Sequence, residues 1–249
     1  MPARVLLLLV ALALPARADD LQLVGVSPDG SQVALIATTA DMPRGFHEHS
    51  LEVRSVPDGK LLTSAPLVAA SVRSRWARAG EFELYRLEVE RGRREALARV
   101  RELGFSPPLA VPAASSTASD PRHPEDPPMV ATLRLGDADI DASVRSTATS
   151  AALVLRSGDR ELALDPRPVD VVAVSGRPES VVFRWFGVRE AWRDPAGRSL
   201  LLVVDTFVPV QPSFAARSVL VMAPLGPIVE ALDLPVSIAG GLASPPLVP

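Results

Sequence analysis

Residues 24–35 read VGVSPDGSQVAL, which places a tight turn between two apolar, β-prone runs. Within the turn, Pro28 fixes its own backbone φ and Gly30 accepts a positive φ, so SPDG favours a reversal of the chain. The apolar runs on either side, residues 21–26 and 32–38, have the length of strands. The stretch therefore predicts an antiparallel hairpin, which decides the fold class of the first part of the chain.

The alternation of strands and turns continues after this hairpin. A polar loop leads to a third apolar run at residues 51–56, and PDG at residues 57–59 supplies another turn. We therefore expect residues 19–66 to form one β-meander.

Residues 67–105 are predicted to be a helical segment with one long amphipathic helix. Six Glu and six Arg are interspersed between residues 81 and 102, and such mixed charges suit a solvated helix face. Gly104 ends the pattern, as glycine ends many helices. Apolar or small residues recur at spacings of three and four, which makes one stripe for the core: Phe82, Tyr85, Val89, Gly92, Ala96, Val100 and Leu103.

The remaining chain divides by composition. Residues 106–128 are rich in Pro, Ala and Ser and lack apolar periodicity, which predicts a linker or exposed loop. Residues 129–234 again alternate β-prone runs with turns and are predicted to be a β-rich region that packs with residues 19–66. Residues 235–249 are rich in Gly and Pro, so we expect a flexible tail.

The two β regions align at an offset of 167 residues without a gap. SPDG at 27–30 falls on DPAG at 194–197, and the apolar run 33–36 falls on 200–203. One interpretation is a small antiparallel meander used twice. The other is chance, because Pro and Gly mark turns everywhere and the chain has 25 Pro and 15 Gly. One meander cannot bury its own apolar face, so two copies are expected to pack together in a sheet or sandwich.

The first 18 residues have the three parts of a secretory signal peptide. Arg4 gives a positive start, residues 5–14 are an unbroken apolar run, and Ala16 and Ala18 are the small residues that a signal peptidase reads. The apolar run is about half of the roughly twenty residues that a membrane-spanning helix needs. We expect cleavage between Ala18 and Asp19, and hence an exported protein that is periplasmic or secreted.

The mature chain is expected to be soluble, because no later apolar run is long enough to span a membrane. The sequence has 0 Cys, so neither a lipid anchor on cysteine nor a disulfide is available, and a hydrophobic core must hold the fold. The signal holds two of the 26 basic residues, which leaves 24 against 29 acidic residues and a net charge of -5. This mildly acidic balance argues against nucleic acid as a partner.

Residues 24–35 together with residues 51–59, LEVRSVPDG, resemble one blade of a TolB-type β-propeller. Such blades carry an SPDG turn before an apolar strand, followed by a strand that ends in a second turn. A complete propeller needs about 4–8 blades, and this chain offers at most two. The resemblance implies a mainly β (α+β) fold with two propeller-blade-like antiparallel meanders, and not a full propeller.

The first 105 residues also resemble an uncharacterised family of bacterial predicted secreted proteins. Members open with a signal peptide and an SPDG segment, followed by an Ala/Arg-rich helix that ends as residues 96–105, ALARVRELGF, do here. The chain departs from the family at residues 41–46, DMPRGF, where members carry an acidic, Gly-rich segment. The family has no established activity, so the resemblance implies no site residues.

Motifs for catalysis and cofactor binding are missing from the sequence, which has no G-x-S-x-G elbow, no G-x-G-x-x-G and no P-loop. We therefore expect no cofactor. The densest candidate for metal is His47-Glu48-His49, since residues i and i+2 of a strand share a face and two imidazoles can share an ion. Asp41 or Glu52 is the candidate third ligand. The other interpretation of this segment is a loop tip without metal.

Two hypotheses for the function follow. The preferred one is an exported, non-catalytic module that binds another protein or component of the cell envelope, because the pattern is blade-like and catalytic motifs are missing. The alternative is a periplasmic metal-dependent hydrolase or metal-binding protein that uses His47 and His49. Both hypotheses leave the ligand and the oligomeric state open.

Overall fold

The chain is mainly β, in antiparallel sheets, with three α-helices among the described residues, which confirms the predicted fold class at that level. The predicted signal peptide, 1–18, and its cleavage junction at Ala18 and Asp19 lie outside the described residues. The computed structural model describes residues 20–39, 46–56, 58–115, 129–147, 150–164, 167–168, 171–173, 180–182, 184–210 and 213–238.

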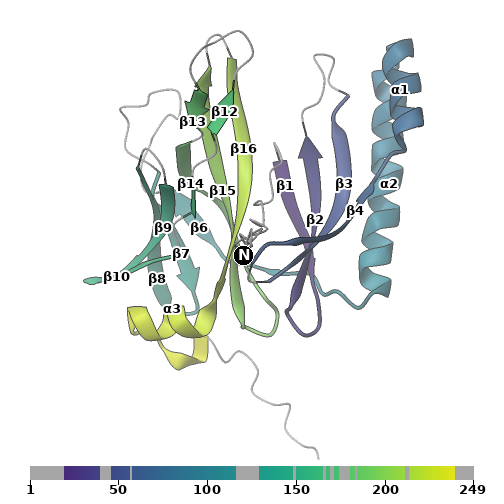
Figure 1. The fold of residues 1–249 in the computed structure, drawn as a ribbon. Helices are drawn as coiled ribbons and strands as arrows, with labels where there is room; N and C mark the ends of the chain where they lie inside the picture. The colour runs from purple at the N-terminus through teal and green to yellow at the C-terminus, as the bar shows by residue number, and fades with distance from the viewer. Residues whose placement is uncertain are drawn as a thin grey trace, which may run out of the picture.

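The N-terminal meander forms a four-stranded sheet, which we call sheet 1 (Figure 1). Its strands pair in chain order, each antiparallel to the next. The SPDG turn joins the first two strands, as its turn chemistry predicts. The strands are β1 (Asp20–Val26), β2 (Gln32–Thr39), β3 (Glu48–Ser55) and β4 (Leu61–Pro66).

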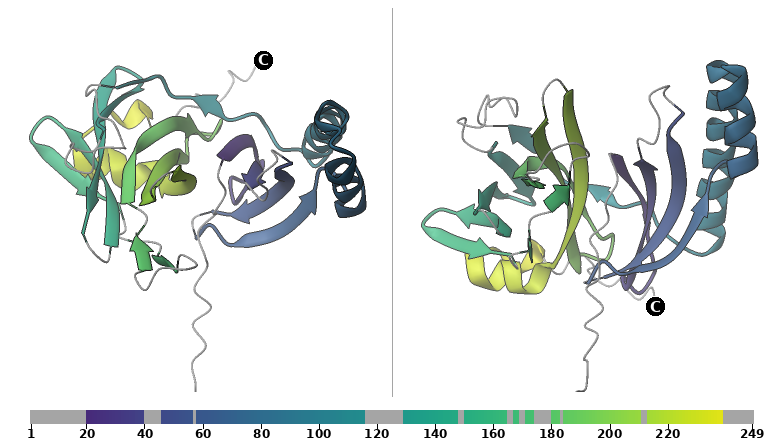
Figure 2. Two further views of the ribbon diagram at one scale, coloured as in Figure 1. Left: turned by 90° about the horizontal axis from the view of Figure 1, so that it is seen from above. Right: turned by 45° about the horizontal axis from the view of Figure 1, so that its top comes forward.

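A second antiparallel sheet, sheet 2, has the strand order β16-β15-β14-β5. It lies between sheet 1 and a third sheet, so the three sheets form successive layers (Figures 1 and 2). The strands of sheet 2 are β5 (Leu109–Ala110), β14 (Arg184–Arg193), β15 (Ser199–Val210) and β16 (Ser213–Pro224).

Sheet 3 is six-stranded, with the order β10-β9-β8-β7-β6 and β11 paired to β9. Two of the short strands, β5 and β6, lie within the segment 106–128 that composition predicts to be a linker or loop; residues 116–128 of it are outside the described residues. Strands of two and three residues are too short to show periodicity. The strands are β6 (Ala113–Ser115), β7 (Ala131–Leu135), β8 (Ala138–Ser146), β9 (Ser150–Ser157), β10 (Arg160–Ala163) and β11 (Arg167–Pro168); β12 (Val171–Ala173) and β13 (Ser180–Val182) pair separately.

Helices pack at two places on this stack, against the outer face of sheet 1 and beside one end of the strands of sheets 2 and 3 (Figures 1 and 2). α2 (Phe82–Glu102) lies against the outer face of sheet 1, and α1 (Ala70–Ala79) lies beside it. α3 (Leu225–Leu232) follows β16 directly and buries its apolar side in the core between sheets 2 and 3. The short 3₁₀ helix η1 (Val236–Ile238) adds the buried Ile238 to that core, so the predicted tail begins with packed residues, and residues 239–249 are outside the described part.

Strand β15 is buried on both of its faces. Leu200, Leu202 and Val204 belong to the core between sheets 2 and 3, whereas Leu201 and Val203 belong to the core between sheets 1 and 2. Successive side chains of a strand point to opposite faces, so a strand covered on both sides needs an unbroken apolar run. The run LLLVV at residues 200–204 meets that need.

The core between sheets 1 and 2 joins the two meanders face to face. From sheet 1 it takes the residues of β1 and β2 that alternate toward sheet 2, and from sheet 2 it takes residues of β15 and β16. Its buried members are Leu21, Leu23, Val26, Val33, Leu35, Ala37, Leu201, Val203, Leu220 and Met222.

The turns at residues 27–30 and 194–197 have the same main-chain hydrogen-bond pattern. In each, the N–H of the first turn residue donates to the carbonyl oxygen five residues later, at 3.0 Å, and the glycine N–H donates back to the first residue, at 2.9 and 2.8 Å. The φ angles of Gly30 and Gly197 are 71° and 70°, in the left-handed region that favours glycine. The equivalence predicted at the offset of 167 residues therefore holds for the geometry of this turn.

The equivalence does not extend through the second hairpin of each meander. Val33 of β2 pairs with Arg54 of β3, whereas the corresponding Leu200 of β15 pairs with Ala223 of β16. At the same offset Arg54 corresponds to Val221, so the register of the second hairpin differs by two residues.

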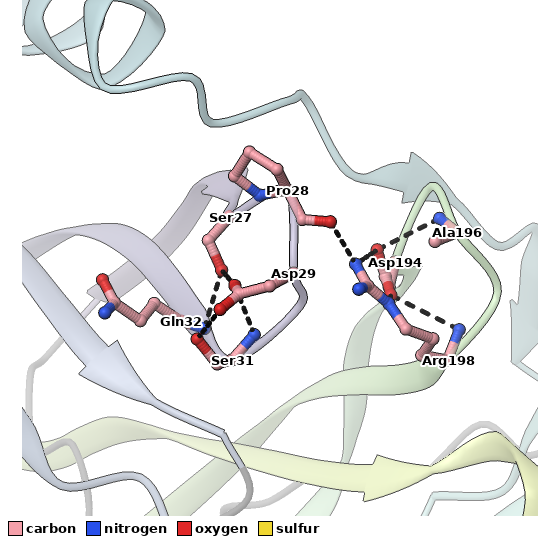
Figure 3. Close-up of polar contacts among 8 residues, drawn as sticks. All are labelled: Ser27, Pro28, Asp29, Ser31, Gln32, Asp194, Ala196 and Arg198. Atoms are coloured by element: carbon pink, nitrogen blue, oxygen red, sulfur yellow. Dashed lines mark hydrogen bonds and ion pairs between the residues drawn. The ribbon is translucent and has the colours of Figure 1, made fainter.

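An arginine connects the two turns (Figure 3). The Arg198 guanidinium donates to the carboxylate of Asp194 at 2.6 Å and to the main-chain oxygen of Pro28 at 3.0 Å. Asp194 is 1% exposed, so its carboxylate depends on this arginine and on the N–H of Ala196 at 3.1 Å. Sheets 1 and 2 are therefore linked by a polar contact at this end as well as by their shared core.

The SPDG turn predicts an acid dependence of stability. The Ser27 hydroxyl, followed by the side chain and N–H of Ser31, lowers the pKa of Asp29 from 3.8 to about 2. Because the folded pKa lies below the unfolded one, ionised Asp29 stabilises the fold above about pH 4, and this contribution is lost as the pH falls toward about 2. Asp29→Asn is expected to lower the urea concentration at the midpoint of unfolding at about pH 6. Below about pH 4, that midpoint should fall less steeply with pH in the variant than in the unchanged protein.

The control for this experiment is Asp159→Asn, which removes a carboxylate from the exposed turn between β9 and β10. It should leave the slope of the urea midpoint against pH near that of the unchanged protein. If Asp29→Asn gave the same curve as Asp159→Asn, the Asp29 prediction would be wrong.

Helix α2 comes very close to the connection between β4 and α1 at Gly92. A Cβ added at this position would overlap the main-chain carbonyl oxygen of Leu67. Gly92 lies on the buried side of α2, together with Tyr85, Ala96 and Val100. Backbone atoms fill the space, so a movement of side chains alone does not relieve the overlap.

Gly92→Ala is therefore expected to destabilise the fold by about 1–3 kcal/mol, the usual range for overpacking, although alanine is the better helix former. The matched control is Gly226→Ala in α3, where the added Cβ would meet nothing within 4 Å and the exchange should be neutral or stabilising. Urea unfolding followed by circular dichroism gives both values. Equal effects of the two substitutions would contradict the close approach at Gly92.

None of the helices in the described part of the chain is long and apolar enough to cross a bilayer.

Candidate functional site

A cavity of about 370 Å³ lies between helix α2 and the outer face of sheet 1. We call it the α2 pocket. Its apolar wall consists of Ile36, Leu67, Phe82, Tyr85 and Val89. Its polar lining consists of Asp20, Gln22, Thr38, His47, His49, Arg86, Glu90 and Arg93.

Strand alternation decides which residues of sheet 1 reach the pocket. In β2, Leu35 and Ala37 point toward sheet 2, so Ile36 and Thr38 point toward the helix. In β3, His49 shares a face with Leu51, which packs against α2. Most of the interface between sheet 1 and α2 is filled by apolar side chains. The pocket lies where polar side chains such as Thr38 and His49 stand in their place.

His49 is held by its neighbour across the ladder. Thr38 and His49 are paired residues of β2 and β3, and the Thr38 hydroxyl lies 3.1 Å from Nδ1 of the imidazole. Burial lowers the pKa of His49, and the nearby His47 and Arg93 lower it further. The imidazole is therefore neutral at neutral pH and offers one donor and one acceptor.

His47 lies just before β3, beside the aromatic end of the pocket. The Tyr85 hydroxyl donates to the main-chain oxygen of His47, and burial raises the pKa of Tyr85. Nδ1 of the His47 ring is buried and has no hydrogen-bond partner among the described residues. A buried polar atom without a partner costs about 1–3 kcal/mol.

Aromatic residues cluster at this end. The ring of the buried Phe46 packs edge-on against Phe82, with centroids 5.8 Å apart, and against Tyr85 at 5.2 Å. Such arrangements favour further aromatic contacts, since edges and faces of rings attract one another.

Charged residues gather at the other end. The Arg93 guanidinium donates to the amide oxygen of Gln22 at 2.5 Å, which is a neutral partner. Asp20 pairs with Arg189 at 2.7 Å. Arg86, which follows Tyr85 at the aromatic end of the pocket, pairs with Glu83 at 3.1 Å. Within the described residues, the structure gives neither Arg93 nor Glu90 an ion pair.

The structure places both predicted metal ligands on the pocket, with the His47 and His49 ring centroids 6.5 Å apart. Over the residues that can be described, no group of three His, Cys, Asp or Glu side chains is arranged to hold a metal ion. Asp41 lies outside the described residues, and Glu52 is paired with Arg54 at 2.7 Å. Zinc sites in proteins use three or four protein ligands, so the two histidines do not make a metal site by themselves.

Sequence reasoning identified the two histidines but not the residues opposite them on α2. Arg93 belongs to a run of charges that fits a solvated helix face equally well. Its spacing is the available signal, because Phe82, Arg86, Val89 and Arg93 recur three or four residues apart and share one face of the helix. The face that is apolar near Ala96 thus carries both apolar and charged side chains where it covers the pocket.

Comparisons of this chain with models of protein families, with curated proteins and with solved structures found no match.

The environment of His49 predicts its titration. Because burial and two neighbouring groups with positive charge disfavour imidazolium, the titration midpoint of His49 should lie below 6.5. Two-dimensional NMR of the imidazole nitrogens measures the midpoint, with His49→Gln used to assign the signals. His47→Gln removes a neighbour that lowers the pKa of His49, so it should move the midpoint upward. A His49 midpoint at or above 6.5 would contradict the burial of this ring.

Proposed function

We propose that this protein is exported and acts as a non-catalytic binding module of the cell envelope, with the α2 pocket as its ligand site. The observation that carries the proposal is the pocket itself, which combines an apolar wall with charged residues at one end. Small-molecule sites have this composition, in which apolar residues provide contact area and a few polar groups fix the orientation.

The polar groups of the pocket favour binding over catalysis. A nucleophile activated by histidine needs a third group that orients the imidazole. In the described part of the site, the His49 ring has one hydrogen-bond neighbour, the Thr38 hydroxyl, and no carboxylate lies within bonding distance of the ring. Among the described residues, the Thr38–His49 pair therefore lacks the carboxylate that would orient the imidazole as a general base.

The arrangement of the sheets supports the resemblance to propeller blades. The four strands of sheet 1 pair in chain order, and sheet 2 packs against it face to face through a shared apolar core. In this proposal the two blade-like meanders form a rigid frame, and α2 covers the outer face of one of them. The frame holds the pocket residues of β1, β2 and β3 in fixed register.

Export is proposed from the sequence of residues 1–18. Cleavage after Ala18 would place Asp20 and β1 close to the new N-terminus. The proposed location is the periplasm or the extracellular space, and the proposed partner is a small molecule or another component of the envelope.

Filling the pocket tests the proposal. Purified protein is incubated with a small-molecule extract of envelope from the cells that make it, and ligands retained after gel filtration are identified by mass spectrometry. Val89→Trp, which inserts an indole into the pocket, is expected to abolish retention. Leu87→Trp is the matched control, because Leu87 lies two residues away on the exposed side of α2, is 57% exposed and should leave retention unchanged.

Two outcomes would overturn the proposal. One is turnover of an ester, glycoside or peptide substrate that is lost in a single pocket variant. The other is a stoichiometric bound metal ion that disappears in the double variant His47→Ala/His49→Ala, which would favour the metal-dependent alternative.

A further inference from the structure

We propose that the α2 pocket binds a free α-amino acid with an aromatic side chain, its carboxylate on Arg93, its ammonium group toward Glu90 and its ring against Phe82 and Tyr85. This inference rests on the proposed function, because it names the class of ligand for the same site. It follows from the size of the cavity, from two charges of opposite sign that have no ion pair among the described residues, and from the distance along α2 between these charges and the aromatic residues.

The cavity volume restricts the ligand to a small molecule. At about 370 Å³ the pocket is near the lower end of the range for small-molecule sites, about 300–1,000 Å³. The volume suits a single amino acid better than a peptide or a lipid chain.

Arg93 supplies the site for a carboxylate. Its guanidinium carries five N–H donors in a planar fork, and its one hydrogen bond among the described residues goes to the neutral Gln22 side chain. The arginine is half-buried, which strengthens its interaction with an anion. A carboxylate can accept two parallel hydrogen bonds from such a fork.

Glu90 supplies the opposite charge at the mouth of the pocket. It lies three residues before Arg93 on α2 and is exposed to solvent. The described structure shows no ion pair between these two residues, although both line the cavity. A ligand that carries both charges would satisfy the two groups together, whereas a ligand with one charge would leave the other group unmatched.

The aromatic side chain is inferred from the other end of the pocket. Arg93 and Tyr85 are eight residues apart on α2, which separates them by about 12 Å along the helix axis. Phe82, Tyr85 and the buried Phe46 form a cluster of edge-to-face and tilted rings at that end. A ligand ring can add to this cluster, and a hydroxyl at its tip would lie on the side of His47, which also lines the pocket.

Calorimetric titration with four probes tests the assignment on the unchanged protein. L-phenylalanine and L-tyrosine are expected to bind. 3-Phenylpropionate lacks the ammonium group and phenethylamine lacks the carboxylate, so each should bind about tenfold or more weakly than phenylalanine, which is the usual effect of losing one charged hydrogen-bond partner. Equal binding of all four probes, or no binding of the amino acids, would overturn the inference.

Variants assign each charge to its residue. Arg93→Gln should weaken phenylalanine and 3-phenylpropionate by about tenfold or more and leave phenethylamine unchanged. Glu90→Gln should weaken phenylalanine and phenethylamine and leave 3-phenylpropionate unchanged. The matched controls are Arg94→Gln and Glu95→Gln, neighbours on α2 that do not line the pocket and should bind as the unchanged protein does. Reversed or absent selectivity in the two pocket variants would contradict the assignment.

The failure of this inference is distinguishable from the failure of the proposed function. If a different molecule from the envelope extract is retained and Val89→Trp abolishes its retention, the function stands and the amino-acid class is wrong. If phenylalanine binds Val89→Trp as well as the unchanged protein, the ligand occupies another place, and both the pocket assignment and the ligand class are wrong.

Discussion

The burial of β15 on both faces is the constraint on which the rest of the structure depends. One set of its side chains fills the core against sheet 3 and α3, and the alternate set fills the core against sheet 1. All five residues of the run 200–204 are 0% exposed. The two larger cores are therefore joined through one strand, because each of them contains side chains of β15.

This constraint explains which parts of the fold are visible in the sequence. The turns at 27–30 and 194–197 are decided locally by Pro, Gly and a side-chain acceptor, and both hairpins follow from them. The run 200–204 is apolar without alternation because both of its faces are covered. By contrast, β5 and β6 exist because neighbouring strands offer them pairing partners, and no local pattern marks them.

The candidate site was predictable only in part, for a related reason. His47 and His49 stand out as two of three histidines in the chain. Arg93 and Glu90 look like the other charges of α2, and their role depends on the way the helix lies across β1 and β2. The packing of Gly92 against Leu67 and of Val100 against sheet 1 determines that placement. A pocket between a helix and a sheet is a tertiary property, so residue spacing on either element is insufficient to predict it.

The contact between Arg198 and Pro28 joins residues 170 positions apart in the chain. Sheet 1 is complete by residue 66, but the cover for Leu21, Leu23 and Leu35 comes from β15 and β16. As synthesis proceeds from the N-terminus, the first meander therefore presents an uncovered apolar face until the last quarter of the chain has been made. The entropy of closing so long a loop must be lost before these contacts form, which slows their formation. Its two ends must consequently reach the native state together, as a single folding unit.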